Sequence, residues 1–296
     1  MLLTHPVGWL IPALAALFLY GIGQGLVKKN IGDVSPARYC LYYVVAKAFV
    51  TLGYFFTHEH PPLLAPENRE FLYFGVLAYL LDGAGWIMYF ESIVAGPITI
   101  VGTLSAAYSA PTVIFGWLIL GEVLLPVQYF GVAMVILGCV TLSYSPTGGE
   151  QAVRGRSWIV LALGALLAWG LAQTASKHAY GLPGASESSM SFFSTLGGGL
   201  TLGLYGLLRG GAGGDHSIRD WGKSFLPMGM MAAGDLCVII ATRWGPISLV
   251  TPISSAYPVV TIIFAAYALK EKVTRLQYAG IACVLLGMFV AQGIVG

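Results

Sequence analysis

Charged residues are scarce in this sequence of 296 residues. Only 9% of them are Asp, Glu, Lys or Arg, whereas roughly a quarter of the residues in soluble domains are charged. Apolar residues make up 57%, above the roughly 45–50% of soluble domains. The composition therefore predicts a membrane protein. The formal net charge of +2 gives no reason to expect a nucleic-acid partner.

Motifs for catalysis and for ion conduction are also missing. The sequence has no HExxH, P-loop, GxSxG or paired acidic metal motif, so we expect neither an enzyme nor a bound metal or cofactor. It has no ring-forming filter or charged pore signature, which argues against a channel. Four cysteines fall inside apolar runs, with no CxxC or His/Cys cluster, so we expect buried packing roles for Cys40, Cys139, Cys237 and Cys283.

Long apolar runs dominate the rest of the sequence. A helix needs about 20 mostly apolar residues to cross ~30 Å of hydrocarbon. This measure predicts ten spans, at residues 7–27, 36–57, 70–92, 97–120, 124–144, 157–177, 187–208, 224–243, 246–269 and 275–294. No basic segment precedes the first run, so we interpret it as a retained span rather than a cleaved signal peptide.

The sequence repeats itself at a constant offset of 149 residues. Residues 96–142 align without a gap to residues 245–291, and residues 9–28 align to residues 158–177. We predict a first five-helix repeat at 1–147, a linker at 148–156 and a second five-helix repeat at 157–296. The identical pairs include Trp9/Trp158, Gly21/Gly170, Gln24/Gln173, Ser105/Ser254, Tyr108/Tyr257, Glu122/Glu271 and Gly138/Gly287.

An odd number of spans in each repeat has a topological consequence. The second repeat must enter the membrane from the opposite face, so the halves are predicted to be inverted copies around a pseudo-two-fold axis in the membrane plane. Inverted repeats are typical of secondary transporters, whose substrates bind near the midplane where the repeats meet. If the two halves exchange conformations, an outward-open shape becomes inward-open, so the duplication predicts alternating access.

Positive charge is unevenly distributed between the two sets of connections. Eleven of the 15 Lys and Arg residues fall in or beside connections 1–2, 3–4, 5–6, 7–8 and 9–10. Lys and Arg favour the cytoplasmic side of a membrane. This bias predicts that both termini lie outside.

Two sequence patterns resemble a known family. They are ILGEVLLPVQYFGVAMVILG with its copy ALKEKVTRLQYAGIACVLLG, and the W/Y-G-x-x-Q-x-x-x-K pattern that closes the first and sixth spans. Both are similar to ten-span EamA-type members of the drug/metabolite transporter superfamily, and the resemblance covers both halves. One departure is Lys270, which stands where the family usually has a Gly before Glu.

The resemblance implies an all-α membrane protein with two five-helix bundles around a central cavity. Spans 1, 3, 4, 6, 8 and 9 would line the cavity, and spans 5 and 10 would lie at the periphery. It also implies transport of small organic solutes, often amino acids and frequently as export. The expected location is the bacterial inner membrane, with the chain crossing it many times.

Prolines interrupt the fourth and ninth spans, which contain GPITIVGTLSAAYSAP and GPISLVTPISSAYP. The Gly-Pro pairs suit helix starts, where the missing proline N–H would be unpaired anyway. Pro111, Pro252 and Pro258 lie further in, where each would free a carbonyl and bend its helix. Free backbone groups at membrane depth survive only against protein or a watery cavity. We expect hinges at these three prolines, which either line a cavity or form packing kinks.

Hydroxyl side chains paired by the repeat are candidate substrate ligands. Tyr108 and Tyr257 fall about half way along the fourth and ninth spans, and Ser105 and Ser254 lie three residues earlier on the same face. They could form a collar around the substrate. Alternatively, the tyrosines pack as hydrophobes and the serines bond to their own helices.

Amide and indole side chains are further candidates. Gln24 and Gln173 are paired by the repeat, and an amide could bind an amino-acid-like solute with both donors and acceptors. The same amides could instead tie neighbouring helices together. Trp86 and Trp169 could contact substrate, although interfacial belts and bundle packing explain most aromatic residues in membranes.

Among the ionisable residues inside predicted spans, four are candidates for a functional role, because each costs ~2.5–3.5 kcal/mol to insert. Asp82 and Asp235 lie near the middle of the third and eighth spans, Lys47 is central in the second, and Glu91 lies toward the end of the third. The aspartates could recognise an ammonium group or carry a proton. Alternatively, Lys47 forms a static bridge with one carboxylate, and the adjacency of spans 2 and 3 favours Asp82.

Other charged residues lie near span ends. Glu122 and Glu271 occupy tight turns before the fifth and tenth spans, where a negative charge complements a helix N-terminus. We therefore favour a capping role over a coupling role for both. Lys28 and Lys177 are expected to extend toward the membrane interface.

Small residues recur every two turns in the fifth and tenth spans. This stripe suits close helix contact, and it could be used within the chain or between two copies. Both a monomer and a homodimer therefore remain open. The glycines are Gly131 and Gly138 in the fifth span, with Gly280 and Gly287 in the tenth.

These features favour a secondary transporter in the lipid bilayer. The first choice of substrate is an amino acid or a related small metabolite, exported by alternating access and coupled to protons. The alternatives are an exchanger or facilitator for organic cations or for anionic metabolites such as sugar phosphates, and a membrane subunit that does not transport.

Overall fold

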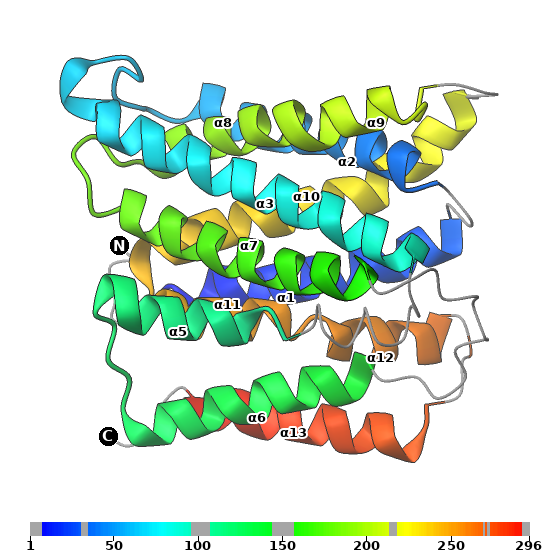
Figure 1. Cartoon of the computed structure of the whole chain (residues 1–296). Helices are drawn as coiled ribbons and strands as arrows, with labels where there is room; N and C mark the ends of the chain where they lie inside the picture. The colour runs from blue at the N-terminus through cyan, green and yellow to red at the C-terminus, as the bar shows by residue number, and fades with distance from the viewer. Residues whose placement is uncertain are drawn as a thin grey trace.

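The computed structural model describes residues 8–30, 35–95, 107–143, 157–212, 218–268, 270 and 273–291. This part of the chain is helical with short connections, and it contains no β-strand. The helix axes run close to one common direction (Figure 1). The helices are α1 (Leu10–Asn30), α2 (Pro36–Thr57), α3 (Arg69–Ala95), α5 (Ser109–Leu120), α6 (Pro126–Ser143), α7 (Ser157–Ala179), α8 (Glu187–Gly198), α9 (Leu204–Leu208), α10 (Ile218–Trp244), α11 (Ile247–Ser255), α12 (Pro258–Ala268) and α13 (Arg275–Ala291).

Seven helical segments of the described chain are long and apolar enough to cross a membrane. Three shorter apolar helices fall where the fourth, fifth and tenth spans are predicted, at Ser109–Leu120, Pro126–Leu142 and Arg275–Ala291. The all-helical membrane architecture is therefore confirmed, and the count of ten crossings stays a prediction. The seven segments are Leu10–Val27, Pro36–Thr57, Pro66–Ser92, Ser157–Ala179, Glu187–Leu208, Arg219–Trp244 and Ile247–Ala268.

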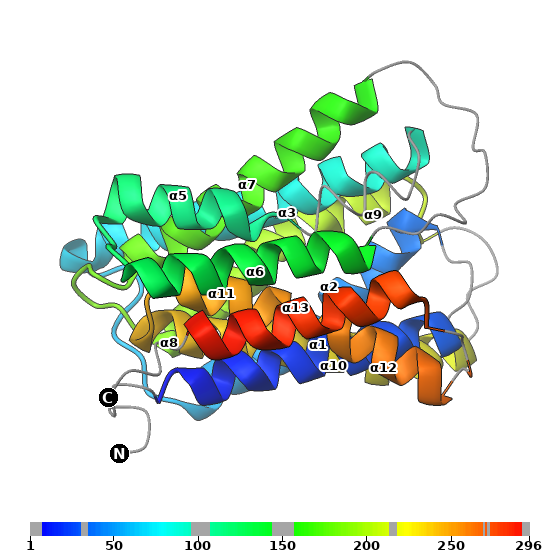
Figure 2. The same cartoon turned by 90° about the horizontal axis from the view of Figure 1, so that it is seen from below.

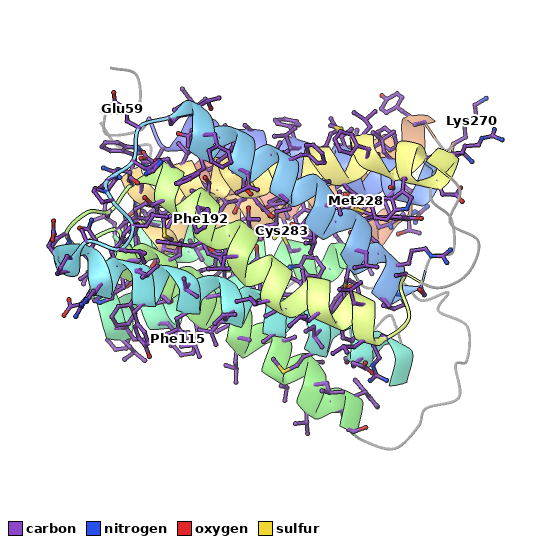
Figure 3. All side chains as sticks on the ribbon, turned by 90° about the horizontal axis from the view of Figure 1, so that it is seen from above. Glu59, Phe115, Phe192, Met228, Lys270 and Cys283 are labelled. Atoms are coloured by element: carbon purple, nitrogen blue, oxygen red, sulfur yellow. The ribbon has the colours of Figure 1, made fainter. Side chains whose placement is uncertain are left out.

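Apolar side chains cover the outside of the bundle as well as its interior (Figure 3). Phe49, Phe56 and Trp117 are each more than half exposed. Water would oppose such a surface, whereas acyl chains match it. Glu59 and Lys270 mark opposite ends of the helices in Figure 3. The side faces of the bundle therefore suit the hydrocarbon layer.

Local sequence explains where several helices start and stop. The Ser35 side chain accepts a hydrogen bond from the Arg38 N–H at 3.3 Å, and Pro36 occupies the first turn of α2. Ser186 caps α8 in the same way, accepting from the Ser189 N–H at 3.1 Å. Helix α5 ends at Gly121, whose φ of 68° is a conformation that glycine adopts without strain.

The prolines of the ninth span act in three different ways. Pro246 is the N-cap residue of α11, which confirms the predicted helix start. Pro252 lies inside α11, which continues to Ser255, and the bend expected at this proline stays a prediction. The chain does break at Ala256 and Tyr257, and Pro258 begins α12. A proline is tolerated in a first turn because it needs no N–H partner there.

The fourth span is described only in part. Residues 96–106, which include the predicted helix start at Gly96-Pro97 and the candidate ligand Ser105, lie outside the described residues. Pro111 lies in the first turn of α5, where its missing N–H leaves no gap in the helix.

Helices from the two halves of the chain interleave. Helix α1 packs against α10, α11 and α12, and its repeat counterpart α7 packs against α3, α5 and α11. Helix α2 contacts α8, α9 and α10, whereas α6 lies along α13. Figure 2 shows α6 and α13 side by side, with the same pairing visible at the edge of Figure 1. Helices of the first half therefore pack directly on helices of the second half throughout the described bundle.

The predicted glycine stripe is used within the chain. A Cβ atom added to Gly138 would lie 2.9 Å from the carbonyl oxygen of Gly280, and one added to Gly287 would lie 2.7 Å from that of Gly131. The backbones of α6 and α13 therefore approach as closely as the absence of side chains permits. Because residue numbers rise in α6 as they fall in α13, the two helices are antiparallel.

Another glycine pair shows that equivalent residues meet equivalent neighbours. A Cβ on Gly21 would lie 2.9 Å from the Tyr257 carbonyl oxygen and close to Val260, and one on Gly170 would lie 3.0 Å from Pro111. The offset of 149 that relates Gly21 to Gly170 also relates Pro111 to Val260. The same contact therefore occurs twice, once on each side of the bundle.

All four cysteines are free thiols. Cys40 and Cys139 are buried, and Cys237 and Cys283 are partly buried. Their surroundings agree with the packing roles expected from the sequence.

Candidate functional site

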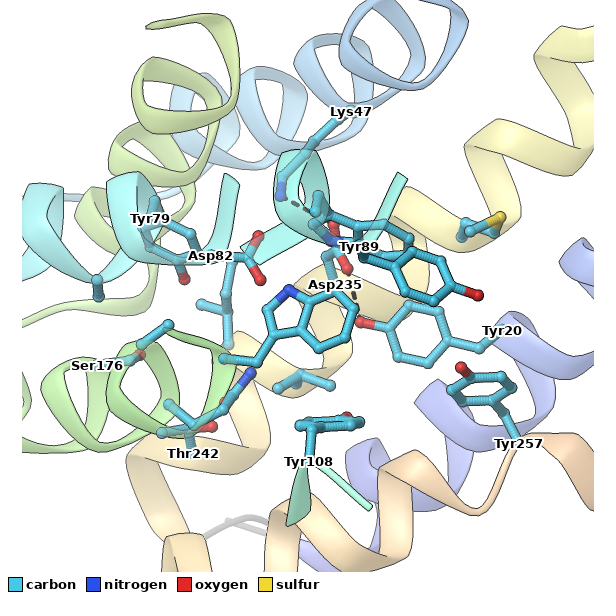
Figure 4. Close-up of a pocket in the computed structure, with 18 of the residues that line it drawn as sticks. Tyr20, Lys47, Tyr79, Asp82, Tyr89, Tyr108, Ser176, Asp235, Thr242 and Tyr257 are labelled. Atoms are coloured by element: carbon cyan, nitrogen blue, oxygen red, sulfur yellow. Dashed lines mark hydrogen bonds and ion pairs between the residues drawn. The ribbon is translucent and has the colours of Figure 1, made fainter. Parts of the chain in front are cut away.

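A cavity of about 400 Å³ lies in the middle of the bundle. Its walls come from α1, α2, α3, α7 and α10, together with Tyr108 just before α5 and Tyr257 between α11 and α12 (Figure 4). The expected lining spans 1, 3, 4, 6, 8 and 9 all contribute, and α2 is an additional wall that the sequence did not suggest. The predicted site residues that line it are Gln24, Lys47, Asp82, Trp86, Tyr108, Trp169, Gln173, Asp235 and Tyr257.

Asp235 is held by three side-chain donors. Its carboxylate accepts a hydrogen bond from the Tyr20 hydroxyl at 2.6 Å and another from the Tyr43 hydroxyl. Its Oδ2 atom lies 3.0 Å from Lys47 Nζ. The Lys47 side chain is only 3% exposed and that of Asp235 16%. A paired charge with further hydrogen bonds is the form in which a buried carboxylate is tolerated.

The partner of Lys47 differs from the one favoured by the sequence. Consecutive spans suggested Asp82 on α3, but the ion pair joins Lys47 to Asp235 on α10. The reason is that α2 packs on α10 and α8 instead of on the next helix in the chain. Lys47 Nζ also lies 5.6 Å from the ring centroids of both Tyr43 and Tyr79, within range of a cation–π interaction.

Asp82 is left with no direct partner. Its carboxylate makes no ion pair or hydrogen bond with any residue that the structure describes. Figure 4 shows it directed toward the same space as Asp235 and Lys47. The cavity therefore contains one satisfied carboxylate and one unsatisfied carboxylate.

Aromatic rings form a connected wall beside Asp82. The Trp169 ring lies 5.3 Å from Trp86, 5.6 Å from Tyr89 and 5.7 Å from Tyr108, measured between ring centroids. Trp169 can occupy this position because residue 85 has no side chain. A Cβ at Gly85 would lie only 2.7 Å from the Trp169 Nε1 atom. A glycine is therefore required on α3 where the indole lies against it.

Two buried donors at the cavity have no acceptor. Trp169 Nε1 and Thr242 Oγ1 make no hydrogen bond in the described part of the protein. Both residues line the cavity. Buried polar groups are normally satisfied, so these two atoms are exceptions in the helices that form the cavity wall.

Several lining residues were not found from the sequence. Tyr20 is the repeat counterpart of Trp169 and stands in the same W/Y-G-x-x-Q pattern, so the pattern itself was a usable signal. The others are aromatic or small polar residues inside spans, where nothing local distinguishes lining from packing. They include Tyr39, Tyr79, Tyr89, Phe90, Ser176 and Thr242.

The cavity frame follows the repeat, but its charges do not. Tyr20 and Trp169 are equivalent by the offset of 149, as are Gln24 with Gln173 and Tyr108 with Tyr257. The charged residues instead have uncharged counterparts, because the same offset relates Asp82 to Met231, Asp235 to Trp86 and Lys47 to Leu196. A symmetric shell thus holds an asymmetric charge pattern.

The other predicted site residues that the structure describes are not part of the cavity wall. Ser254 donates to the Val250 carbonyl at 2.9 Å in its own helix, which was one of the two alternatives. Glu91 pairs with Arg209 at 2.8 Å near the surface, so it does not join the charges of the cavity. Pro111, Pro252 and Pro258 are absent from the described cavity wall.

Lys177 and Glu122 form a charge clamp on the junction of α10 and α11, close to Thr242 in the cavity wall. Lys177 Nζ donates to the carbonyls of Thr242 at 2.9 Å and Gly245 at 2.7 Å, at the end of α10. Glu122 accepts from the backbone N–H groups of Ile247 at 2.9 Å and Ser248 at 3.0 Å, at the start of α11. A cation at a helix C-terminus and an anion at an N-terminus both complement the helix dipole.

This clamp corrects two expectations. Lys177 does not extend freely to the interface, because it is bound to the end of another helix. Glu122 does cap a helix, but the helix is α11 of the other half and not the fifth span. Its repeat partner Glu271 lies outside the described residues.

No metal site is evident among the described residues, which contain no group of three or more His, Cys, Asp and Glu side chains arranged to hold an ion. The polar chemistry of the cavity is instead that of carboxylate, amide, hydroxyl and indole groups. These groups can hydrogen-bond and pair charges with a small organic molecule.

Comparison with known proteins agrees with the geometry. The model of the EamA-like transporter family matches this sequence twice, at residues 7–144 and 156–292. A solved structure described only as "Crystal structure of protein" superposes with a TM-score of 0.76 at 17% identity, covering 96% of this chain and 98% of that one. At that identity the likeness concerns the fold alone. Because the family match extends over both halves, this chain belongs to the EamA-like transporter family, a family of multi-pass membrane transporters of small solutes.

Proposed function

We propose that this protein carries small organic solutes across the membrane by alternating access, with the central cavity as the binding site. The observation that carries this proposal is the position of the cavity, which is enclosed by equivalent helices from both halves of the chain. A site between two repeats can be exposed to either side by rocking one repeat against the other.

The mechanism requires ten spans in two inverted repeats, which we place at residues 1–147 and 157–296. The antiparallel contact of α6 with α13 supports inversion, because these helices are equivalent in the repeat yet run in opposite directions. The reciprocal contacts of Gly21 and Gly170 support a pseudo-two-fold relation. Parallel copies would place equivalent helices in the same direction.

The proposed substrate is an amino acid or a related small metabolite, and the proposed direction is export across a bacterial inner membrane. The amides of Gln24 and Gln173 and the hydroxyls of Tyr108 and Tyr257 supply donors and acceptors in the cavity wall. A volume of about 400 Å³ suits a molecule of this size.

Protons are the proposed coupling ion, with a cavity carboxyl group as their carrier. The described charged groups facing Asp82 in the cavity are Lys47 from α2 and Asp235 from α10. Replacing the carrier with Asn should abolish the pH dependence of uptake in proteoliposomes. If Asp82→Asn and Asp235→Asn both keep the wild-type pH profile, proton coupling through these residues is wrong.

Counterflow tests the transport function directly. Purified protein is first screened for metabolites that raise its thermal unfolding midpoint, and the best stabiliser is then used, radiolabelled, with reconstituted liposomes. Liposomes preloaded with unlabelled solute should accumulate label transiently only when they contain the protein. The Glu91→Gln variant serves as a matched control, because its carboxylate lies outside the cavity. Tight binding without counterflow would instead indicate a membrane subunit that does not transport.

A further inference from the structure

The cavity contains three charged side chains in its described wall, namely Lys47, Asp82 and Asp235. Lys47 and Asp235 neutralise each other across 3.0 Å. Two tyrosine hydroxyls complete the hydrogen bonding of the Asp235 carboxylate. The pair is therefore a neutral and fully engaged part of the wall, and Asp82 is the charge that remains.

Displacing the pair to bind a ligand would be unfavourable. A cation that took Asp235 would leave Lys47 buried without its partner, and an anion that took Lys47 would leave Asp235 without its cation. Removing one member of a buried pair costs several kcal/mol in typical proteins, roughly 3–5. The Lys47–Asp235 pair is thus an unsuitable ligand site for either charge.

Asp82 has the opposite character. It lies on α3 between Tyr79 and Trp86, which are one turn away on the same face of the helix. No residue that the structure describes donates to its carboxylate. The Asp82 side chain is partly buried at the cavity wall. A carboxylate shielded from bulk water is unfavourable without a hydrogen-bonding partner, so a cation that enters the cavity supplies a direct contact that no described residue makes.

The surroundings of Asp82 also suit a cation. Trp86, Tyr89, Tyr108 and Trp169 form a connected group of rings next to it. Aromatic faces attract ammonium groups, more strongly where water is excluded. Carboxylate and ring faces together are typical of sites that bind an amine or a quaternary ammonium.

We propose that this cavity selects solutes that carry one positive charge, with the ammonium group bound by Asp82 and the adjacent aromatic rings while the Lys47–Asp235 pair stays intact. This inference rests on the proposed function, because it names the charge class of the carried solute. It includes zwitterions whose ammonium group binds Asp82, and it excludes solutes whose only charge is negative.

A matched set of probes tests the charge requirement in detergent, without transport. The set is phenethylamine, its uncharged analogue 2-phenylethanol, the anion phenylacetate, and phenylalanine, which is the same amine with an added carboxylate. Binding is measured by quenching of tryptophan fluorescence, since Trp86 and Trp169 line the cavity. We expect phenethylamine to bind about tenfold or more tightly than 2-phenylethanol, as a charge-assisted hydrogen bond predicts, and phenylacetate to bind most weakly. Comparison of phenylalanine with phenethylamine reports whether an added carboxylate is accepted.

Variants assign the preference to Asp82. In Asp82→Asn the amine should lose its advantage over the alcohol, and in Asp82→Glu a large part of it should remain. Glu91→Gln should leave the preference unchanged, because Glu91 pairs with Arg209 outside the cavity. Helical content and the thermal unfolding midpoint show whether Asp82→Asn is folded. If it is not, the Asp82→Glu variant and the probe series in the wild type still decide.

Two results would overturn the inference. One is equal or tighter binding of 2-phenylethanol or phenylacetate by the wild type, and the other is an undiminished amine preference in folded Asp82→Asn. Neither depends on counterflow. Charge-selective binding without counterflow would refute the proposed transport while supporting the cation site. Counterflow of a neutral or anionic solute would do the reverse.

Discussion

Asp235 and Asp82 are chemically identical side chains in one cavity, yet their neighbours give them different roles. Asp235 receives a lysine and two tyrosine hydroxyls, all from helices of the first half. Asp82 has none of these contacts. The two aspartates are not equivalent in the repeat, because the offset of 149 relates Asp82 to Met231. At the scale of single residues, the hydrogen-bonding partners therefore distinguish two carboxylates that line the same cavity.

The Lys47–Asp235 pair leads to a stability prediction. Lys47→Met should lower the free energy of unfolding by about 3–5 kcal/mol, because Asp235 then keeps its charge without a cation. The double variant Lys47→Met with Asp235→Asn should recover much of this loss, since no unpaired charge remains. Thermal and denaturant unfolding in mild detergent provides the measurement.

A surface ion pair in the same protein provides the comparison. Arg209 and Glu91 lie 2.8 Å apart, and their side chains are 63% and 32% exposed. Arg209→Met should cost only about 0–1 kcal/mol, as expected for exposed pairs. Equal losses for Lys47→Met and Arg209→Met would mean that the central pair is not desolvated.

At the scale of helices, the junction of α10 and α11 is held from both sides. Lys177 of α7 binds the carbonyl groups that end α10, and Glu122 binds the N–H groups that begin α11. Thr242, whose carbonyl Lys177 holds, also lines the cavity. The clamp therefore holds the end of a helix that contributes to the cavity wall.

Loosening this clamp should destabilise the junction. Glu122→Gln keeps the shape of the side chain but removes its charge, so it weakens two backbone hydrogen bonds and a helix-dipole interaction. We expect a loss of about 1–2 kcal/mol in unfolding free energy. Amide hydrogen exchange at Ile247 and Ser248 should accelerate.

Glu70→Gln is the control, because Glu70 is exposed in the first turn of α3 and binds no other helix end in the described part of the chain. Unchanged exchange in Glu122→Gln would contradict the clamp.

The contact of α6 with α13 gives a second prediction for helix packing. Gly138→Leu should push these helices apart, because its Cβ alone would lie 2.9 Å from the Gly280 carbonyl oxygen. Overpacking of this kind costs about 1–3 kcal/mol. Gly53→Ala is the matched control, since nothing lies within 4 Å of a Cβ at that position, and replacing a helical glycine gains about 0.5–1 kcal/mol. Similar unfolding midpoints for Gly138→Leu and the wild type would show that α6 and α13 tolerate separation.

Helix positions were more predictable from sequence than helix neighbours. The second span was expected at 36–57 and is observed as Pro36–Thr57, because a proline and a polar segment mark its ends. The break before Pro258 also follows from local chemistry. The partner of Lys47 did not, since it depends on α2 packing against α10 and not on order along the chain. Cavity residues such as Tyr79 and Thr242 were missed for the same reason.

At the scale of the whole molecule, the two halves provide a nearly symmetric frame around an asymmetric charge pattern. Under the proposed alternating access, equivalent contacts such as those of Gly21 and Gly170 would allow two arrangements of similar packing energy. The asymmetric charges would then give a bound solute one preferred orientation in both arrangements. On this proposal the symmetric frame provides access and the asymmetric side chains provide recognition.

Alternating access predicts that locking one end of the bundle stops transport without preventing binding. The change is Gly116→Cys with Ser248→Cys, which joins α5 of the first half to α11 of the second beside the Glu122 clamp. A Cβ at Gly116 would lie 2.6 Å from Ser248 Oγ, so side chains at these two positions are in direct contact. A disulfide needs such proximity, because its two Cβ atoms are only about 3.5–4.5 Å apart. Oxidation should abolish counterflow, and reduction should restore it.

Oxidised wild-type protein is the control for the four native thiols, of which Cys237 and Cys283 are only partly buried. The oxidised variant should still bind solute in detergent, since neither Gly116 nor Ser248 lines the cavity. Its counterflow should fall at least tenfold, because transport would require α5 and α11 to separate where the disulfide joins them, while binding would not. Full counterflow with the disulfide formed would mean that α5 and α11 move as one body, and access would then have to alternate elsewhere.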